Sequence, residues 1–346
     1  MNLVTQSWQA PGAWFAVGLF AGVLSYFSCL GALRLAQKSG MIALPGERQS
    51  HSHATPTGGG LGLVFSIVIT TLCLELIISL PVFWWQNMLP GVLLLAVVGW
   101  RDDRVPVSSF VRLVVQLVVS IWLIGFASWA FSLKDVFVVA VIILSIVWLM
   151  NVYNFMDGSN GMAGFQGVFA GLVMAGLFQA GGEQAMALIA LAVAAACAGF
   201  LPLNFPNARV FMGDVSSVPL GFMFASFATY GLYTGSLDLP ISILIMSVFL
   251  VDATLTLLAR AFRGERWYTA HAHHVYQRLI ALGWSHRQVL VLYQAINVFL
   301  VLPVIVLATI YPQYAIAMVG LTLLVLATGW HIANWRLGMT AEVRFK

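Results

Sequence analysis

Long apolar runs separated by short polar connections dominate the chain. Eleven runs come within a few residues of the roughly 20 apolar residues that a helix needs to cross a membrane. They lie at approximately 13–33, 61–80, 84–99, 110–131, 134–150, 163–181, 185–203, 217–234, 239–261, 288–310 and 312–335. An odd number of crossings puts the two termini on opposite sides. The pattern predicts an all-α, polytopic integral membrane protein with about eleven transmembrane helices.

Composition supports this interpretation. Of the 346 residues, 61% are apolar and only 8% are charged, whereas a soluble domain has roughly 25% charged residues. Such a chain cannot cover a surface that faces water, so most of it must face lipid. We expect a single transmembrane domain over 1–346. The cysteines at 29, 73 and 197 lie inside apolar runs, and we expect them to be small buried side chains.

The distribution of basic residues assigns the two faces. If the N-terminus is outside, the inside connections are near 34–60, 100–112, 151–162, 204–216, 262–287 and 336–346. With Arg260 at a span end, these stretches hold fifteen of the sixteen basic residues, and only Lys134 falls outside. The positive-inside rule makes this side cytoplasmic and the N-terminus periplasmic. The net charge of +4 follows from this rule, so nucleic acid is not an expected partner.

The first polar motif on the inner side is GWRDDR. Asp102 and Asp103 follow the third apolar run directly. Two adjacent carboxylates can bind a divalent cation, or one can act as a base. A solvated helix end balanced by Arg101 and Arg104 explains the pair equally well.

A second motif follows the fifth run, in NVYNFMDGSNG. Asn151, Asn154 and Asp157 recur at i, i+3 and i+6 and so share one helical face, where they could reach a metal or a phosphate. The glycines at 158, 161 and 164 permit a tight turn and close approach of a ligand. The alternative is a polar helix end with a glycine cap.

A third motif contains Asn204, Phe211 and Asp214. Asp214 comes just before a new apolar run, where a helix N-terminus offers free N–H groups and partial positive charge. Helix capping alone would explain Asp214, but it would not explain the asparagine and the phenylalanine beside it.

Histidines occupy two inner connections. His271, His273 and His274 lie among arginines that include Arg263, and phosphate binding suits this composition better than zinc, which would want cysteine or acidic ligands. Structural histidines are the alternative. The glycine-rich run HSHATPTGGGLG at 51–62 could cradle a phosphate or simply relax a turn.

Two acids lie inside apolar runs. Such residues are functional candidates by default. Asp252 is about two turns from Arg260, so a structural pair is as good an interpretation, and the role of Glu75 stays open.

These motifs together resemble the polyprenyl-phosphate N-acetylhexosamine-1-phosphate transferase family, which is glycosyltransferase family 4. The resemblance rests on the paired aspartates, the Asn-x-x-Asn-x-x-Asp-Gly-x-x-Gly segment, the FMGD box at 211–214 and the histidine-rich loop, and it spans nearly the whole chain. The segments ERQSHSHATPTGGGLG, VDATLTLLAR and HAHHVYQRL most resemble the sequences of the subgroup that starts O-antigen synthesis.

The resemblance implies a reaction and a set of roles. An N-acetylhexosamine 1-phosphate passes from a UDP-sugar to undecaprenyl phosphate, with Mg²⁺ (or Mn²⁺ in its place) as cofactor. Asp157 and Asp214 would hold the metal, and Asp102 and Asp103 would complete the catalytic carboxylates. The family's nucleotide site would map to Asn151, Asn154, Asn204 and Phe211. The diphosphate or lipid phosphate would be held by Arg263, His271, His273 and His274.

Two departures from the family pattern bear on the metal and on the substrate. Many relatives carry a second aspartate where this chain has Asn160, and an amide can bind uracil, ribose or sugar but adds no negative charge for a metal, so Asn160 is expected in substrate binding and outside the metal shell. The peptidoglycan enzyme's loop lysine also has no counterpart in 51–62. The resemblance thus favours UDP-linked N-acetylglucosamine, N-acetylfucosamine or N-acetylquinovosamine over the muramoyl-pentapeptide of the phospho-N-acetylmuramoyl-pentapeptide transferases.

Location and assembly follow the same resemblance. It implies a multi-pass protein of the bacterial inner membrane whose site faces the cytoplasm, and it allows a homodimer. A lipid or solute transporter is the rival class. Transporters place ionisable groups near the bilayer midplane and often show inverted repeats, whereas the polar motifs here cluster at one face and no repeat is evident.

Overall fold

The computed structural model describes residues 11–43, 54–125, 136–265 and 273–344, with side chains up to 336. Its α-helices are α2 (Pro11–Ser39), α3 (Gly60–Glu75), α4 (Leu89–Asp102), α5 (Ser109–Gly125), α6 (Val136–Phe155), α7 (Met162–Ala180), α8 (Gln184–Asn204), α9 (Asp214–Thr234), α10 (Leu239–Phe262), α11 (Val275–Ala281), α12 (His286–Ile296), α13 (Leu302–Ile310) and α14 (Ala315–Arg344). The strands β1 (Ile42–Ala43) and β2 (Thr55–Pro56) form one short antiparallel pair.

The predicted all-α, polytopic architecture is confirmed. Most of each predicted apolar run is helical over its described residues, but the helix predicted at 61–80 ends at Glu75, and a turn and irregular backbone follow it over 76–80. Within those residues, eight helices are long and apolar enough to cross a membrane, while α3 and α5 are shorter apolar helices. The run at 84–99 is completed by a π-helical turn, η1 (Trp84–Met88), ahead of α4. A second π-helical turn, η3 (Asn297–Val301), joins α12 to α13, and a 3₁₀ turn, η4 (Pro312–Tyr314), precedes α14.

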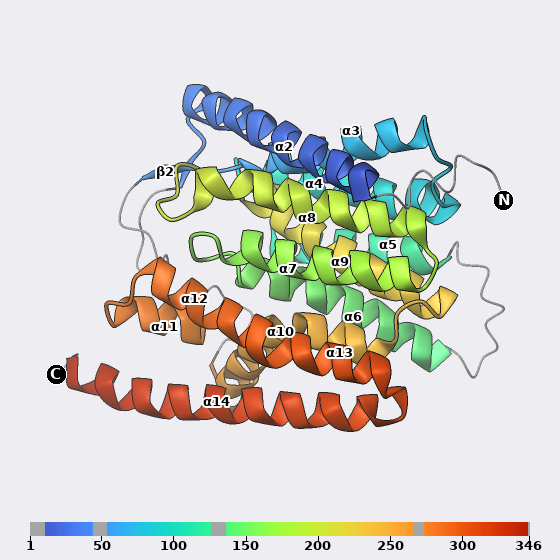
Figure 1. Cartoon of the computed structure of the whole chain (residues 1–346). Helices are drawn as coiled ribbons and strands as arrows, with labels where there is room; N and C mark the ends of the chain where they lie inside the picture. The colour runs from blue at the N-terminus through green and yellow to red at the C-terminus, as the bar shows by residue number, and fades with distance from the viewer. Residues whose placement is uncertain (1–10, 44–53, 126–135, 266–272, 345–346) are drawn as a thin grey trace.

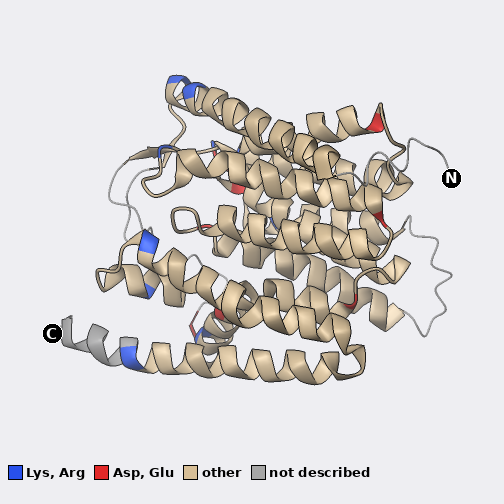
Figure 2. Ribbon diagram, viewed as in Figure 1, with Lys and Arg blue, Asp and Glu red and all other residues tan. Residues whose placement is uncertain are grey.

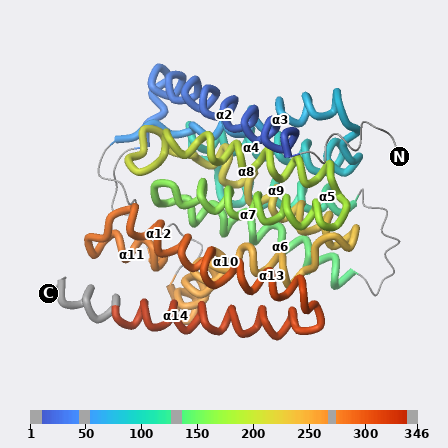
Figure 3. The backbone as a smooth tube through the Cα atoms, in the orientation of Figure 1, coloured from blue at the N-terminus to red at the C-terminus, as the bar shows by residue number. Residues whose placement is uncertain are grey.

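The helices lie side by side along one direction (Figure 1). α2 and α3 form one edge of the bundle in this view and α14 forms the other, while the backbone trace shows the short α11 beside α12 at the left end (Figure 3). α9 lies at the centre, where it contacts α3, α4, α6, α7 and α10. Most of its side chains are buried, so the start of α9 is held firmly at one end of the bundle.

Charge divides the bundle into two ends. The described lysines and arginines gather toward the left end in Figure 2, where the connections between α4 and α5, α6 and α7, and α8 and α9 also lie. At the end of α3, Glu75 accepts hydrogen bonds from Leu80 N (2.9 Å) and Trp85 Nε1 (2.8 Å). These bonds close the turn after α3.

Candidate active site

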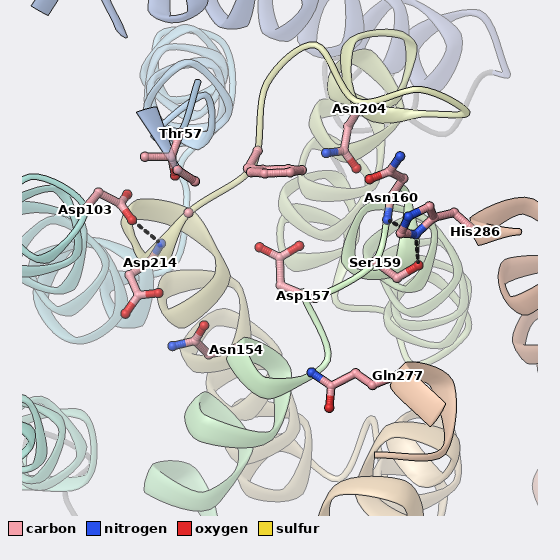
Figure 4. A pocket seen from close by; sticks show the side chains of 14 residues that line it. Thr57, Asp103, Asn154, Asp157, Ser159, Asn160, Asn204, Asp214, Gln277 and His286 are labelled. Carbon is pink, nitrogen blue, oxygen red and sulfur yellow. Dashed lines mark hydrogen bonds between the residues drawn. The ribbon is translucent and has the colours of Figure 1, made fainter. Parts of the chain in front are cut away.

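A cavity of about 260 Å³ opens at the basic end of the bundle. It is lined by Ala43, Thr57, Asp103, Asn154, Asp157, Gly158, Ser159, Asn160, Asn204, Phe211, Gly213, Asp214, Gln277 and His286. These residues come from segments far apart in the sequence, and Figure 4 shows their side chains around one space. Three of the predicted carboxylates and four of the predicted amides and aromatics thus meet at one place.

The start of α9 is built around Asp103. Its Oδ1 accepts the N–H of Asp214 at 3.0 Å, and its Oδ2 accepts that of Val215 at 3.3 Å. A carboxylate suits this place because the first N–H groups of a helix have no partner inside the helix and carry partial positive charge. Gly213 precedes Asp214 with φ +75°, and a Cβ there would lie 2.4 Å from Asp103 Oδ2. Glycine at 213 therefore lets the Asp103 carboxylate approach the first N–H groups of α9.

The glycine-rich turn after β2 supports the same segment from the other side. Gly59 N–H donates to Phe211 O and Gly60 N–H to Met212 O, both at 3.0 Å, and Phe211 N–H donates to Pro56 O at 2.8 Å. A Cβ on Gly60 would lie 1.7 Å from Ser216 Oγ. These glycines therefore permit close packing, and their N–H groups bind protein carbonyls rather than cradling a phosphate.

Asp102 and Arg112 lie next to the cavity but not in its lining. One guanidinium nitrogen, Arg112 Nη1, is 3.0 Å from Asp102 Oδ2 and 3.3 Å from Asp214 Oδ2. Asp102 also accepts the N–H of Val107. The two adjacent aspartates are therefore separated in role: Asp103 lines the cavity, and Asp102 holds an arginine against Asp214.

The three polar residues predicted to share one helical face, Asn151, Asn154 and Asp157, also differ in whether they line the cavity. Asn154 lines the cavity, and its Oδ1 accepts the hydroxyl of Ser217 at 3.3 Å. Asn151 lies one turn deeper, where its Nδ2 donates to Gln116 Oε1 at 2.8 Å. Asp157 comes two residues after the end of α6 and lines the cavity from the turn. Asn151 is thus a contact between α5 and α6 rather than a member of the lining.

The carboxylates share a poorly solvated space. Burial raises the pKa of Asp103 to about 6, although the two N–H bonds to its oxygens oppose the shift. Burial, followed by the negative charges of Asp214 and Asp103, raises the pKa of Asp157 well above its ordinary range. Within the described residues the Asp157 carboxylate has no hydrogen bond or ion pair. A cation placed among these groups would stabilise their charged forms.

These residues fit Mg²⁺. The metal is usually held by one or two protein carboxylates together with substrate phosphates and water. Asp157 and the Asp214 oxygen that does not face Arg112 could supply the protein ligands. Asp103 is less suited to this role, since both of its oxygens already accept backbone N–H groups. No cluster of three or more His, Cys, Asp or Glu ligands occurs in the part of the chain that the structure describes.

Two asparagines tie the α6–α7 turn to the segment before α9. Asn204 Oδ1 accepts the N–H of Gly161 at 2.7 Å, and its Nδ2 donates to Val210 O at 3.0 Å. Asn160 Nδ2 donates to Pro206 O at 3.0 Å. Asn204 is buried, so its main work is to fix the shape of the cavity, while Asn160 also presents part of its side chain there.

The histidine-rich loop lies outside the cavity lining as far as it is described. His274 is buried, stacks on the rings of Phe155 and Tyr276, and has its Nδ1 4.0 Å from Asp252 Oδ1. Burial lowers the pKa of His274, although Asp252 opposes the shift. The predicted phosphate-binding role of His274 stays a prediction. His271 lies outside the described residues.

The exposed part of this loop forms ion pairs of its own. His273 Nδ1 and Arg263 Nη1 lie 3.7 and 3.8 Å from Glu265 oxygens, and the partly buried Glu265 also pairs with Arg260 Nε at 3.1 Å. Burial and the neighbouring arginines lower the pKa of His273. The predicted phosphate-binding role of Arg263 and His273 stays a prediction, since neither reaches the cavity.

Asp252 anchors the short helix that follows this loop. Its Oδ1 accepts the N–H of Val275 at 3.0 Å and the hydroxyl of Thr256 at 3.3 Å, and its Oδ2 accepts the Tyr293 hydroxyl at 2.6 Å. The carboxylate thus joins α10, α11 and α12, in place of the Arg260 pairing that its spacing suggested.

Several lining residues were not predicted from the sequence: Thr57, Ser159, Gln277 and His286. Ser159 and His286 each lie beside residues that had been singled out, in the DGSNG turn and at the end of the 262–287 connection. Gln277 is a polar residue of α11 with no motif around it. Their roles depend on how α11 and α12 dock against the α6–α7 turn, which no local pattern encodes.

The sequence is similar to a known protein family and to several proteins with named activities. The model of glycosyl transferase family 4 matches residues 85–232, which include every carboxylate of the cavity lining. The chain is 29% identical over 314 residues to the decaprenyl-phosphate N-acetylglucosaminephosphotransferase of Mycobacterium tuberculosis, over 80% of this chain and 78% of that protein.

Other relatives have related names. The identity is 29% over 273 residues to the probable undecaprenyl-phosphate N-acetylglucosaminyl 1-phosphate transferase of Bacillus subtilis, over 75% of each chain. It is 27% over 286 residues to a phospho-N-acetylmuramoyl-pentapeptide-transferase of Staphylococcus aureus, over 72% of this chain and 84% of that protein. Residues 85–232 are thus similar to glycosyl transferase family 4, and homologues of the chain are polyprenyl-phosphate N-acetylhexosamine 1-phosphate transferases.

Proposed function

We propose that the protein transfers an N-acetylhexosamine 1-phosphate from a UDP-sugar to undecaprenyl phosphate and releases UMP. The observation that carries this proposal is the meeting of Asp103, Asp157 and Asp214 around one cavity at the basic end of a membrane bundle. At that position a lipid phosphate held at the membrane surface and a water-soluble nucleotide could both reach the same groups. Relatives named for this reaction support the assignment.

The reaction needs little covalent help from the protein. An oxygen of the lipid phosphate attacks the β-phosphorus of the UDP-sugar, the bond from that phosphorus to the oxygen bridging to the α-phosphate breaks, and UMP leaves with the electron pair. A phosphate monoester is already largely ionised near neutral pH, so a protein base is optional. Positioning and charge stabilisation then provide most of the catalysis.

The residues divide this work. Asp157 and Asp214 would hold Mg²⁺, which when bound neutralises diphosphate charge and stabilises the leaving group. Asp103 fixes the start of α9, and with it the position of Asp214. Arg112 forms an ion pair with one oxygen of Asp214 and so stabilises its negative charge. Phe211 offers a ring face to the uracil, and Asn154 and Asn160 offer amides to the nucleotide or the sugar.

We further propose that the enzyme works at the cytoplasmic side of the bacterial inner membrane and begins an O-antigen or another cell-envelope polysaccharide. N-acetylglucosamine, N-acetylfucosamine and N-acetylquinovosamine are the candidate sugars. The loop at 51–62 lacks a counterpart of the peptidoglycan enzyme's lysine, which favours these sugars over a muramoyl-pentapeptide, for which relatives of lower identity are named.

The test is UMP release by purified protein given undecaprenyl phosphate, Mg²⁺ and a panel of UDP-N-acetyl-sugars. We expect at least one sugar to be turned over, and we expect a chelator to abolish the reaction. Asp214→Asn should lower kcat by a factor of about 10² or more, because it removes a metal ligand. Asp238→Asn, at the exposed start of α10, is the matched control and should stay near the wild type. Turnover that survives both chelation and Asp214→Asn would contradict the proposed site.

A further inference from the structure

The cavity has a second wall that differs in chemistry from the carboxylate side. In Figure 4, Ser159, Asn160 and His286 lie on one side of Asp157, and Asp103 and Asp214 lie on the other. His286 is the first residue of α12, whereas Ser159 and Asn160 belong to the turn between α6 and α7. Helix and turn are therefore joined at this wall by side chains more than one hundred residues apart.

Two contacts with the turn orient the ring of His286. The backbone N–H of Asn160 approaches Nδ1 at 3.4 Å, and the hydroxyl of Ser159 lies 2.9 Å from the same nitrogen. Because a backbone N–H can only donate, the Asn160 contact favours the tautomer in which Nδ1 accepts and Nε2 carries the proton.

The wall as a whole suits an uncharged ligand. Its groups are a hydroxyl, a carboxamide and an imidazole, and Gln277 of α11 adds a second carboxamide. In the described lining no lysine or arginine faces the cavity. A UDP-sugar carries its charge on the diphosphate, while the uridine and the hexosamine are neutral and rich in hydroxyl, carbonyl and amide groups. The diphosphate belongs with the metal-binding carboxylates, which leaves a neutral part of the donor for this wall.

We propose that His286 is a binding residue for the uncharged part of the UDP-sugar, and that Ser159 and Asn160 are the positioning residues that orient its ring. The proposal rests on the proposed function, since it names the part of that substrate which the wall contacts. Two sources offer the same chemistry, the uridine and the N-acetylhexosamine, and the measurements below distinguish them.

The experiment compares three substitutions of His286. In His286→Ala the ring is removed, and we expect the KM for the UDP-sugar to rise by about 5- to 50-fold, as when one or two hydrogen bonds to a ligand are lost. The KM for undecaprenyl phosphate should stay unchanged, because the proposed ligand of His286 is a part of the UDP-sugar. His331→Ala, an exposed histidine of α14, is the matched control and should leave both KM values unchanged.

Two further variants separate ligand binding from support of the turn. His286→Asn places an acceptor near the position of Nδ1, so it should keep the turn and the Tm while the KM stays raised. His286→Gln places an amide near Nε2, so it should recover part of the KM even if the Tm falls. A residue that served only to support the turn would show the reverse order, with Asn recovering activity and Gln not.

Inhibition by UMP identifies the group that is recognised. If the Ki for UMP rises by the same factor as the KM, His286 contacts the uridine. If the Ki stays constant while the KM rises and the preference among UDP-sugars changes, it contacts the hexosamine. An unchanged KM in His286→Ala, in an enzyme that turns over normally, would overturn this inference and leave the proposed function intact. A wild type inactive with every sugar would instead contradict the proposed function.

Discussion

Asp102 and Asp103 show how much a single residue step can change at a helix end. One carboxylate faces the N-terminus of α9, and the other faces Arg112 and the N–H of Val107. Consecutive residues on a helix point about 100° apart, and here Asp102 and Asp103 face different partners. Their order decides which one lines the cavity.

Arg112 balances the negative charges of Asp102 and Asp214 through one nitrogen, Nη1. The planar fork of the guanidinium is thus not what both contacts require, and a lysine ammonium could replace it as a point charge. We expect Arg112→Lys to keep kcat for UMP release within about 10-fold of the wild type. Arg112→Met keeps the bulk of the side chain and loses the charge, so Asp102 and Asp214 would repel each other, and kcat should fall by about 10² or more.

Thermal unfolding of both variants provides the control. Similar Tm values together with very different kcat values would show that the charge acts in the site rather than in folding. Equal loss of kcat in Arg112→Lys and Arg112→Met would contradict the point-charge role and imply that the guanidinium geometry matters.

At the residue scale, the sequence predicted the chemistry better than the geometry. Asp103, Asp157 and Asp214 were identified by their position at the ends of apolar runs. The separate role of Asp102 depends on the rotation of α4, and the burial of His274 beside Asp252 could not be read from the histidine-rich loop. Rotation and burial follow from packing between distant elements, which a single sequence does not reveal.

At the scale of elements, the short helix α11 depends on contacts made by others. It has seven residues, too few to be stable by itself. Asp252 of α10 accepts the first N–H of α11 and the hydroxyl of Tyr293 on α12, while Tyr276 donates to Phe155 O at 2.9 Å. One buried carboxylate thus docks the helix that brings Gln277 to the cavity.

Replacing Asp252 should undock α11. In Asp252→Leu the Val275 N–H and the Tyr293 hydroxyl lose their acceptor, at a cost of about 1–3 kcal/mol for each buried donor left unsatisfied. We expect a lower Tm, a lower kcat and faster proteolysis in the connection between α10 and α12. Asp252→Asn keeps one acceptor oxygen and should have a smaller effect on all three.

The same measurements on Asp238→Asn, at the exposed N-terminal end of α10, serve as the control. Proteolysis at the wild-type rate in Asp252→Leu would show that α11 is held mainly by its apolar contacts, such as Val275 and Leu279.

The elements themselves were largely predictable, because each transmembrane helix needs a long apolar run. The predicted helix types and bounds were wrong where an apolar run alone does not determine them. The run at 84–99 begins as the π-helical turn η1, and α9 starts at Asp214 rather than at 217 because Asp103 accepts its first N–H groups. α11 was not predicted, since its seven residues lie inside a polar connection.

At the scale of the whole molecule, the bundle is asymmetric in charge. The described basic side chains gather toward one end, where the cavity also lies, and acidic residues are present toward the other end (Figure 2). This separation is what the positive-inside rule expects of a membrane protein. It would also place the carboxylate cavity where a soluble UDP-sugar and a membrane-held phosphate are both within reach.

The orientation of the bundle can be tested with single cysteines. Cys29, Cys73 and Cys197 are first replaced by alanine, and UMP release confirms that this background is folded. Lys38→Cys then lies in the exposed last turn of α2 at the basic end, and Asp238→Cys lies near the opposite end. In intact right-side-out vesicles, a maleimide that cannot cross the membrane should label position 238 alone, and position 38 should be labelled only after the membrane is opened. Labelling of position 38 alone in sealed vesicles would reverse the assigned faces, and equal labelling of both would contradict a bundle that separates two compartments.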